Sequence, residues 1–233
     1  MDIQSFLNTD QQLLLSFNGS DSLFIDHLAL VLTSAWTWVP LYAALLYLIV
    51  KNNEKAGQII LAIASALLCV AIATGVGDGL VKPAVARLRP SFEPSLAGLV
   101  HTVNNYQGSG FSFFSVHAAN TFSLAVFFSL LIRRRVLTIS LLVWALVNSW
   151  TRLYLGVHYP SDVITGMLFG TLVGCIVYWG YFSMYRRISP KLHYISTQYT
   201  STGYSLCDID VFMTALVGTA VYVLLRTLLT ITI

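Results

Sequence analysis

The polar segment 151–163 (TRLYLGVHYPSDV) brings together residue types that can handle a phosphate ester. It contains Arg152, His158 and Asp162 between two strongly apolar stretches. An arginine fork matches phosphate oxygens in pairs. Pro160 suits the first turn of a helix, so Asp162 falls in that turn and can reach back toward His158. A carboxylate on one imidazole nitrogen makes the other a better nucleophile, so the segment predicts a nucleophilic histidine oriented by an aspartate.

A second polar segment, 82–90 (KPAVARLRP), supplies fixed positive charge. Lys82 and Arg89 add to Arg152 two further cations with many hydrogen-bond donors, which predicts a phosphate cradle. Arg87 has two open interpretations, a contact with the substrate headgroup or with membrane phosphates. Asp78 is expected to orient Lys82 or an arginine, because an unpaired carboxylate is costly near a membrane.

A third segment, 114–120 (FSVHAAN), completes the expected site. Ser115 stands at a helix start, where free backbone N–H groups and the helix dipole favour an anion. His117 is placed to protonate a leaving oxygen. Together the segments predict phosphoryl transfer by a histidine, with fixed positive charge stabilising the transition state. They also predict that one small oxyanion can touch both the Arg89 guanidinium and the His158 ring.

The three segments occur in the order Lys82-x6-Arg89-Pro90, Ser115-Val116-His117 and Arg152-x5-His158-x3-Asp162. This order resembles the three-part signature of the type 2 phosphatidic acid phosphatase family, which includes vanadium haloperoxidases and bacterial lipid phosphatases. The resemblance covers about residues 20–183. It implies a phosphohistidine formed on His158, orientation by Asp162, and acid catalysis by His117. The phosphate-binding groups that it implies are Lys82, Arg89, Ser115, the backbone N–H of Val116, and Arg152.

Two motif positions depart from the family pattern. The family usually reads Pro-Ser-Gly-His in the second motif, whereas Phe114 and Val116 replace Pro and Gly here. We therefore expect this segment to be more helical, with less freedom for its backbone to approach phosphate. Thr151 replaces the usual serine of the third motif and keeps the hydroxyl.

The composition predicts an integral membrane protein. Of the 233 residues, 56% are hydrophobic and 10% are charged, against about 45–50% and about 25% in a soluble domain. We expect one all-α domain, 1–233, with an amphipathic interfacial helix in 1–26 that ends at Asn18-Gly19, a catalytic core in 27–183, and a cytoplasmic loop in 184–210. About six transmembrane helices are expected, at 27–50, 57–80, 112–132, 136–152, 161–183 and a final one at 211–231.

The distribution of Lys and Arg predicts the orientation. Loops 51–56, 133–135 and 186–191 are basic and fall on one face, which the positive-inside rule assigns to the cytoplasm. The expected site then lies on the outer face, where its basic residues are explained by an anionic substrate. A location in a bacterial inner membrane is inferred from the compact loops.

The predicted function is metal-free hydrolysis of a lipid phosphomonoester or diphosphate, whose tail enters sideways between helices. The family resemblance offers undecaprenyl diphosphate, phosphatidylglycerol phosphate, phosphatidic acid and lipid A phosphates, with the first preferred as a common outer-face task. Two alternatives stay open, a vanadate-dependent haloperoxidase and a non-enzymatic lipid-binding or transport protein. The sequence has no stripe of basic residues interleaved with aromatic residues, so it does not indicate nucleic acid as a partner. The spacing of its cysteines does not indicate a metal site. The sequence predicts no cofactor and leaves the oligomeric state open.

Overall fold

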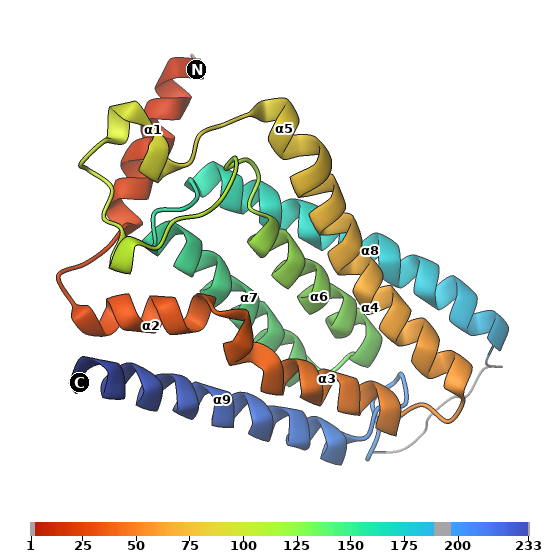
Figure 1. Cartoon of the computed structure of the whole chain (residues 1–233). Helices are drawn as coiled ribbons and strands as arrows, with labels where there is room; N and C mark the ends of the chain where they lie inside the picture. Colours follow the sequence, from red (N-terminus) through yellow and green to blue (C-terminus); the bar gives the residue numbers. More distant parts are fainter. Residues whose placement is uncertain (1–2, 189–196, 233) are drawn as a thin grey trace.

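A computed structural model describes residues 3–188 and 197–232, which form a bundle of α-helices (Figure 1). The α-helices are α1 Ile3–Phe17, α2 Leu23–Thr33, α3 Val39–Lys51, α4 Ala56–Val76, α5 Lys82–Val85, α6 Val116–Ile132, α7 Arg135–Tyr154, α8 Pro160–Ile188 and α9 Leu206–Thr232. Within the described residues there is no β-strand, only an isolated bridge between Tyr199 and Ser205. The all-α prediction is confirmed.

The six predicted spans all fall on helices, but they differ in length. Four helical segments are long and apolar enough to cross a membrane alone: Ala56–Leu96, Arg135–Tyr154, Pro160–Ile188 and Leu206–Ile231. A fifth span forms only if α2 and the stretch Ala35–Lys51, bent by 68° from it, are counted as one. The described residues thus hold four such spans, or up to five, where about six were expected. The remaining predicted span, α6, is a shorter apolar helix of 17 residues, because Ser115 caps it at its N-terminus instead of letting it begin near residue 112.

Two predicted boundaries need adjustment. The expected loop 184–210 is shorter, since α8 continues to Ile188 and α9 already begins at Leu206; residues 189–196 lie outside the described part. At the N-terminus, α1 ends at Phe17, next to the predicted Asn18-Gly19 break, and Gly19 has a positive φ of 72°. Residues 23–26 belong to α2 and not to the interfacial helix.

Helices α6 and α8 approach closely through glycines on α8. A Cβ added to Gly166, Gly170 or Gly174 would lie 2.4, 2.2 and 2.6 Å from the carbonyl oxygens of residues 115, 119 and 123, respectively. Glycine at these positions therefore permits the close packing of the two helices. At the top of this contact, the backbone N–H of Ser115 donates to the carbonyl of Asp162 at 3.0 Å. The glycines thereby place two expected site residues side by side.

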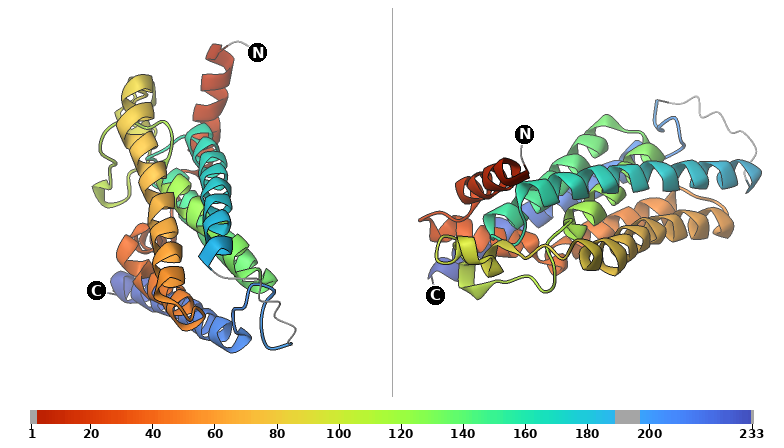
Figure 2. Two further views of the ribbon diagram at one scale, coloured as in Figure 1. Left: turned by 90° about the vertical axis from the view of Figure 1, so that its right-hand side faces the viewer. Right: turned by 90° about the horizontal axis from the view of Figure 1, so that it is seen from above.

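The remaining helices frame this pair. Helices α4 and α7 also pack on α6, whereas α9 lies along α2 and α3 on another side of the bundle (Figures 1 and 2). Helix α1 stands at the end of the bundle where α8 begins (Figure 2). The chain therefore brings α1, the start of α6, the end of α7 and the start of α8 to one end.

Candidate active site

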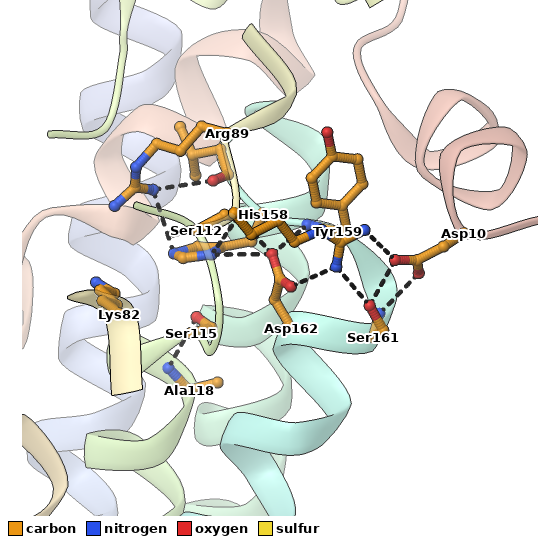
Figure 3. A network of polar contacts seen from close by, with 12 residues as sticks. Asp10, Lys82, Arg89, Ser112, Ser115, Ala118, His158, Tyr159, Ser161 and Asp162 are labelled. Atoms are coloured by element: carbon orange, nitrogen blue, oxygen red, sulfur yellow. Dashed lines mark hydrogen bonds and ion pairs between the residues drawn. The ribbon is translucent and has the colours of Figure 1, made fainter. Parts of the chain in front are cut away.

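His158 lies between α7 and α8 at this end and is only 3% exposed. Its Nε2 is 3.3 Å from Nη1 of Arg89, and its Nδ1 is 3.4 Å from Oγ of Ser112 and 3.6 Å from Oδ2 of Asp162 (Figure 3). A guanidinium can only donate hydrogen bonds, so Nε2 must carry a lone pair. The Ser112 hydroxyl already donates to Asp162 Oδ2, which leaves its oxygen to accept from an Nδ1–H. The surroundings thus select the tautomer whose free lone pair is on Nε2.

The protonation state of His158 follows from its burial. Loss of hydration lowers the pKa of His158 to about 4, and the positive charges of Arg89 and Arg152 act in the same direction. The hydrogen bond and negative charge of Asp162 oppose this shift without overcoming it. The imidazole is therefore neutral near pH 7, as a nucleophile must be.

Arg89 is held rigidly beside the His158 ring. Its Nε donates to the carbonyls of Ser109 and Gly110 at 3.2 and 3.1 Å, its Nη2 to Ser109 O at 2.8 Å, and its Nη1 to Val157 O at 2.9 Å. Gly108 leaves room for this arginine, because an added Cβ there would lie 2.3 Å from Nη1. The 3.3 Å between the guanidinium and the ring allows one oxyanion to contact both groups.

Asp162 is fully buried, and both of its carboxylate oxygens are occupied. Oδ2 accepts from the Ser112 hydroxyl and from the backbone N–H of Tyr159 at 3.1 Å, on the side of His158. Oδ1 accepts from Arg87 Nη1 at 2.7 Å. The carboxylate position is thus fixed from both sides, so it can hold the imidazole orientation.

Arg87 is bonded to several residues of the site. Its Nη1 also donates to Ser161 Oγ at 2.8 Å, its Nη2 pairs with Asp10 at 2.7 Å, and its guanidinium carbon lies 3.7 Å from the centre of the Tyr159 ring. Neither a headgroup nor a membrane phosphate is needed to satisfy this side chain. It is bound within the scaffold that carries Asp162.

His117 lies on the first turn of α6, where its Nε2 is 3.3 Å from Oδ1 of Asn148 on α7. The Asn148 amide donates through Nδ2 to the carbonyl of Trp144 at 2.9 Å. That bond fixes which end of the amide faces the histidine, so Nε2 of His117 must be the donor. His117 therefore carries a proton on Nε2, whether its ring is neutral or protonated on both nitrogens.

The other expected phosphate ligands lie at the ends of their helices. Lys82, at the start of α5, pairs with Asp78 at 2.7 Å, so the prediction that Asp78 orients it is confirmed. Arg152 is buried near the end of α7, where it donates to Tyr106 OH at 3.3 Å and to Thr33 Oγ1. Its Nε has no hydrogen-bond partner among the described residues. A buried N–H of this kind is costly unless a ligand accepts from it.

Ser115 and Val116 form the N-terminus of α6. Ser115 Oγ accepts from the Ala118 N–H at 3.4 Å, and Val116 is the first helical residue, in agreement with the expected helical character of this motif. Gly77, in the π-helical segment Gly77–Val81, makes room for the Val116 side chain: an added Cβ at residue 77 would lie 2.3 Å from its Cγ2. The free N–H groups of this turn point to the same end as His158.

An apolar cavity of about 470 Å³ leads away from His117 between α3, α4 and α6. Its polar lining comes from His117, Asn120 and Thr121 on the first turns of α6 and from Tyr42 on α3. The deeper walls come from Leu45 and Ile49 of α3, Ile63, Ala66 and Val70 of α4, and Leu124 and Phe128 of α6. From His117 to Phe128 the wall follows α6 for about 16 Å. The cavity fits an alkyl chain with its polar end at His117.

Comparison with known proteins now identifies the family. The sequence model of a family described as the PAP2 superfamily matches residues 56–186. The chain belongs to the PAP2 superfamily. A lipid A 4'-phosphatase of Bacteroides thetaiotaomicron is 42% identical over 177 residues, covering 76% of this chain and 78% of that protein. A lipid A 4'-phosphatase of Porphyromonas gingivalis is 33% identical, covering 76% and 74% of the two chains.

A solved structure has the same fold. The crystal structure of a transmembrane PAP2 type phosphatidylglycerolphosphate phosphatase from Bacillus subtilis superposes with a TM-score of 0.59 at 20% identity, covering 81% of this chain and 90% of that one. The sequence-based predictions of a membrane enzyme and of a PAP2-type lipid phosphatase are confirmed.

The structure also adds residues to the site that the motifs do not contain. These are Asp10, Thr33, Tyr106, Ser112 and Asn148, each bonded to an expected site residue. Only Asp10 had a usable sequence signal, since it is the sole charged residue of α1. Among the described residues, no group of three or more His, Cys, Asp or Glu is arranged to hold a metal ion.

Proposed function

We propose that this PAP2 phosphatase removes a phosphate monoester from the sugar headgroup of a lipid A-type glycolipid, through a phosphohistidine on His158. The observation that carries the mechanism is the buried His158 ring, whose Nε2 lies 3.3 Å from the Arg89 guanidinium. The substrate is supported by the two relatives named lipid A 4'-phosphatase. It takes precedence over undecaprenyl diphosphate, which the sequence alone ranked first.

The first chemical step follows from the positions of the histidines. Nε2 of His158 attacks phosphorus, and the bond between phosphorus and the sugar oxygen breaks. The imidazolium form of His117 donates a proton to that oxygen, so the sugar leaves as an alcohol and His117 becomes neutral. Lys82, Arg89, Arg152, the Ser115 hydroxyl and the backbone N–H of Val116 bind the remaining phosphate oxygens and stabilise their charge.

The second step releases inorganic phosphate. Deprotonated His117 takes a proton from a water molecule, whose oxygen attacks phosphorus as the bond to Nε2 of His158 breaks. Asp162 balances the charge that the imidazole carries while it is phosphorylated. No step requires a metal ion, because guanidinium and ammonium groups supply the positive charge.

The tail of the substrate is assigned to the apolar cavity between α3, α4 and α6. Because His117 lines one end of it, a chain lying there leaves its headgroup next to the proposed acid. The cavity is bordered by membrane-facing helices, so the lipid can enter sideways from the bilayer. This geometry supports a lipid substrate and gives no comparable place to a small soluble phosphate ester.

We place the site at the outer face of a bacterial inner membrane. The basic loops 51–56 and 133–135 lie at the ends of α3 and α6, opposite the end that holds His158. The positive-inside rule assigns those loops to the cytoplasm. An outer-face site matches a headgroup that is modified after it has crossed the membrane.

The test is a panel of lipid phosphates assayed for phosphate release by purified protein in detergent with EDTA. The panel holds lipid A, its two monophosphates, undecaprenyl diphosphate, phosphatidylglycerol phosphate and phosphatidic acid. We expect release from the 4'-position to dominate, full activity in EDTA, and no activity in His158→Ala, with His27→Ala as the matched control. Activity that chelation removes and a divalent ion restores would refute the mechanism, and preference for another lipid would refute the substrate.

A further inference from the structure

We propose that Asp10 of α1 is a positioning residue for the nucleophile, acting through Arg87 and Ser161 on Asp162. This inference rests on the proposed phosphohistidine chemistry. It adds to the site a residue from the N-terminal helix, outside residues 56–186 that define the family.

Asp10 is a carboxylate with hardly any access to water. It is only 4% exposed, and its contacts all lead toward the catalytic segment. Oδ1 accepts from the backbone N–H of Ser161 at 2.9 Å, and Oδ2 accepts from the Ser161 hydroxyl at 2.5 Å and from Arg87 Nη2 at 2.7 Å. Since Ser161 is in the first turn of α8, Asp10 also satisfies a free N–H at that helix start, where a negative charge is favoured.

Arg87 connects the two carboxylates directly. One end of its guanidinium pairs with Asp10 and the other with Asp162, both at 2.7 Å. The Tyr159 ring packs against its face at 3.7 Å. With both ends occupied, the planar guanidinium sets the separation and tilt of the two carboxylates. Asp162 is therefore located partly by a residue on α1.

Apolar packing holds α1 against the same segment. Leu14, one turn after Asp10, is fully buried in a small cluster with Leu96 and Tyr159. Farther along, the Asn18 side chain donates to the carbonyls of His101 and Tyr154, both at 2.9 Å. These contacts make α1 a wall of the catalytic end of the bundle.

Removal of the Asp10 charge has a definite electrostatic consequence. Arg87 would then pair with Asp162 alone, and its undivided positive charge would offset more of the negative charge that Asp162 presents to His158. Ser161 would lose the acceptor that fixes the start of α8. Both effects weaken the nucleophile. Lys82 and Arg152, the expected phosphate ligands, form no hydrogen bond or ion pair with Asp10 in the described part of the chain and keep their surroundings.

The experiment compares Asp10→Asn with wild type, using the full chain in detergent and the lipid phosphate that wild type hydrolyses best. We expect kcat to fall by about 10- to 100-fold, as for other outer partners of polar sites, with KM close to that of wild type. Asp21→Asn, in the exposed link between α1 and α2, removes the same charge and should keep wild-type kcat. Unchanged kcat in Asp10→Asn, or a rise in KM alone, would overturn the proposal.

A double-mutant cycle separates positioning from loss of structure. In an Asp162→Ala background, Asp10→Asn should cost little further kcat, because the residue through which it acts is gone. The same loss in both backgrounds would show an independent, structural effect and overturn the inference. Ser161→Ala provides a second test if Asp10→Asn does not fold: we expect a smaller loss of kcat at unchanged KM, and wild-type kcat would contradict the proposal. Wild-type activity that depends on His158 tests the phosphatase mechanism separately.

Discussion

The two histidines of the site have opposite surroundings. His158 is buried, and its ring nitrogens face Arg89 on one edge and Ser112 and Asp162 on the other. Among the described residues, the His117 side chain forms one hydrogen bond, to Asn148, and it borders an apolar cavity. The nucleophile is thus positioned before substrate arrives, whereas the acid is left accessible to it.

The difference matches the demands of the two steps. A nucleophile gains most from a fixed orientation and a fixed tautomer, since its atom must meet phosphorus in line. A general acid must instead reach the leaving oxygen of a bound substrate, and its geometry tightens when that substrate is in place. Asp10, Arg87 and Asp162 therefore brace one histidine, and the lipid tail next to the other completes its environment.

The largest expected effect separates the histidines by their dependence on the leaving group. His158→Gln should lose on the order of 10⁶-fold in kcat, as expected when a covalent nucleophile is removed, for every substrate. In kcat/KM, which covers the first chemical step, His117→Gln should lose roughly 10²–10⁴-fold on a lipid phosphate but much less on an aryl phosphate, whose leaving oxygen needs no proton. The measurement is kcat and kcat/KM for both variants on both substrate types. If an aryl phosphate restored the activity of His158→Gln, or did not restore that of His117→Gln, the assignment of nucleophile and acid to the two histidines would be wrong.

The histidine side of the site was predictable because its residues lie in spaced motifs. Lys82, Arg89, His117, His158 and Asp162 occur with apolar residues between them, so their types and separations stand out in the sequence. The positions of the long helices were also predictable, from the lengths of the apolar segments. The Asn18-Gly19 pair predicts the end of α1.

The contacts of Asp10, Arg87 and Ser112 that fix the position of Asp162 were not predictable in this way. Asp10 and Arg87 are separated by 77 residues, and no periodicity links an interfacial helix to a loop that follows another span. Ser112 lies in the run FSFFS, where a hydroxyl carries no pattern. The chain bends by 68° after Thr33, and the Thr33 hydroxyl at this bend accepts a hydrogen bond from the buried Arg152 on α7. Arg152 is 119 residues away in the sequence, so this contact could not be predicted locally. Such contacts are decided by how helices pack and not by local sequence.

A smaller effect tests whether the open side of the site holds the lipid tail. Leu124→Trp should fill the cavity between α3, α4 and α6, since Leu124 lines its wall. We expect kcat/KM for long-chain substrates to fall by roughly tenfold or more, a usual cost of misfit in an apolar pocket. A short-chain phosphate ester should keep its rate, because the catalytic groups are untouched. Leu146→Trp on the exposed face of α7 is the control. Equal losses on both chain lengths would place the tail elsewhere.

The smallest expected effect concerns the braced side and lies outside neutral pH. Burial lowers the pKa of His158 to about 4, so its Nε2 lone pair persists as the pH falls and is lost only when the pH passes through that value. In His117→Gln acting on an aryl phosphate, which removes the titration of the acid, kcat/KM corrected for ionisation of the substrate should therefore stay level from pH 7 to 5 and decline only toward pH 4. Ring-proton NMR of the free enzyme, with His158→Gln to assign the signal, measures the same titration directly.

The contrary outcome would be a pKa of His158 near the ordinary histidine value. Burial and the charges of Arg89 and Arg152 lower this pKa, whereas Asp162 raises it, so such a value would mean that Asp162 prevails over burial. Nε2 would then be largely protonated in mildly acidic solution, and the contrast between a prepared nucleophile and an accessible acid would fail.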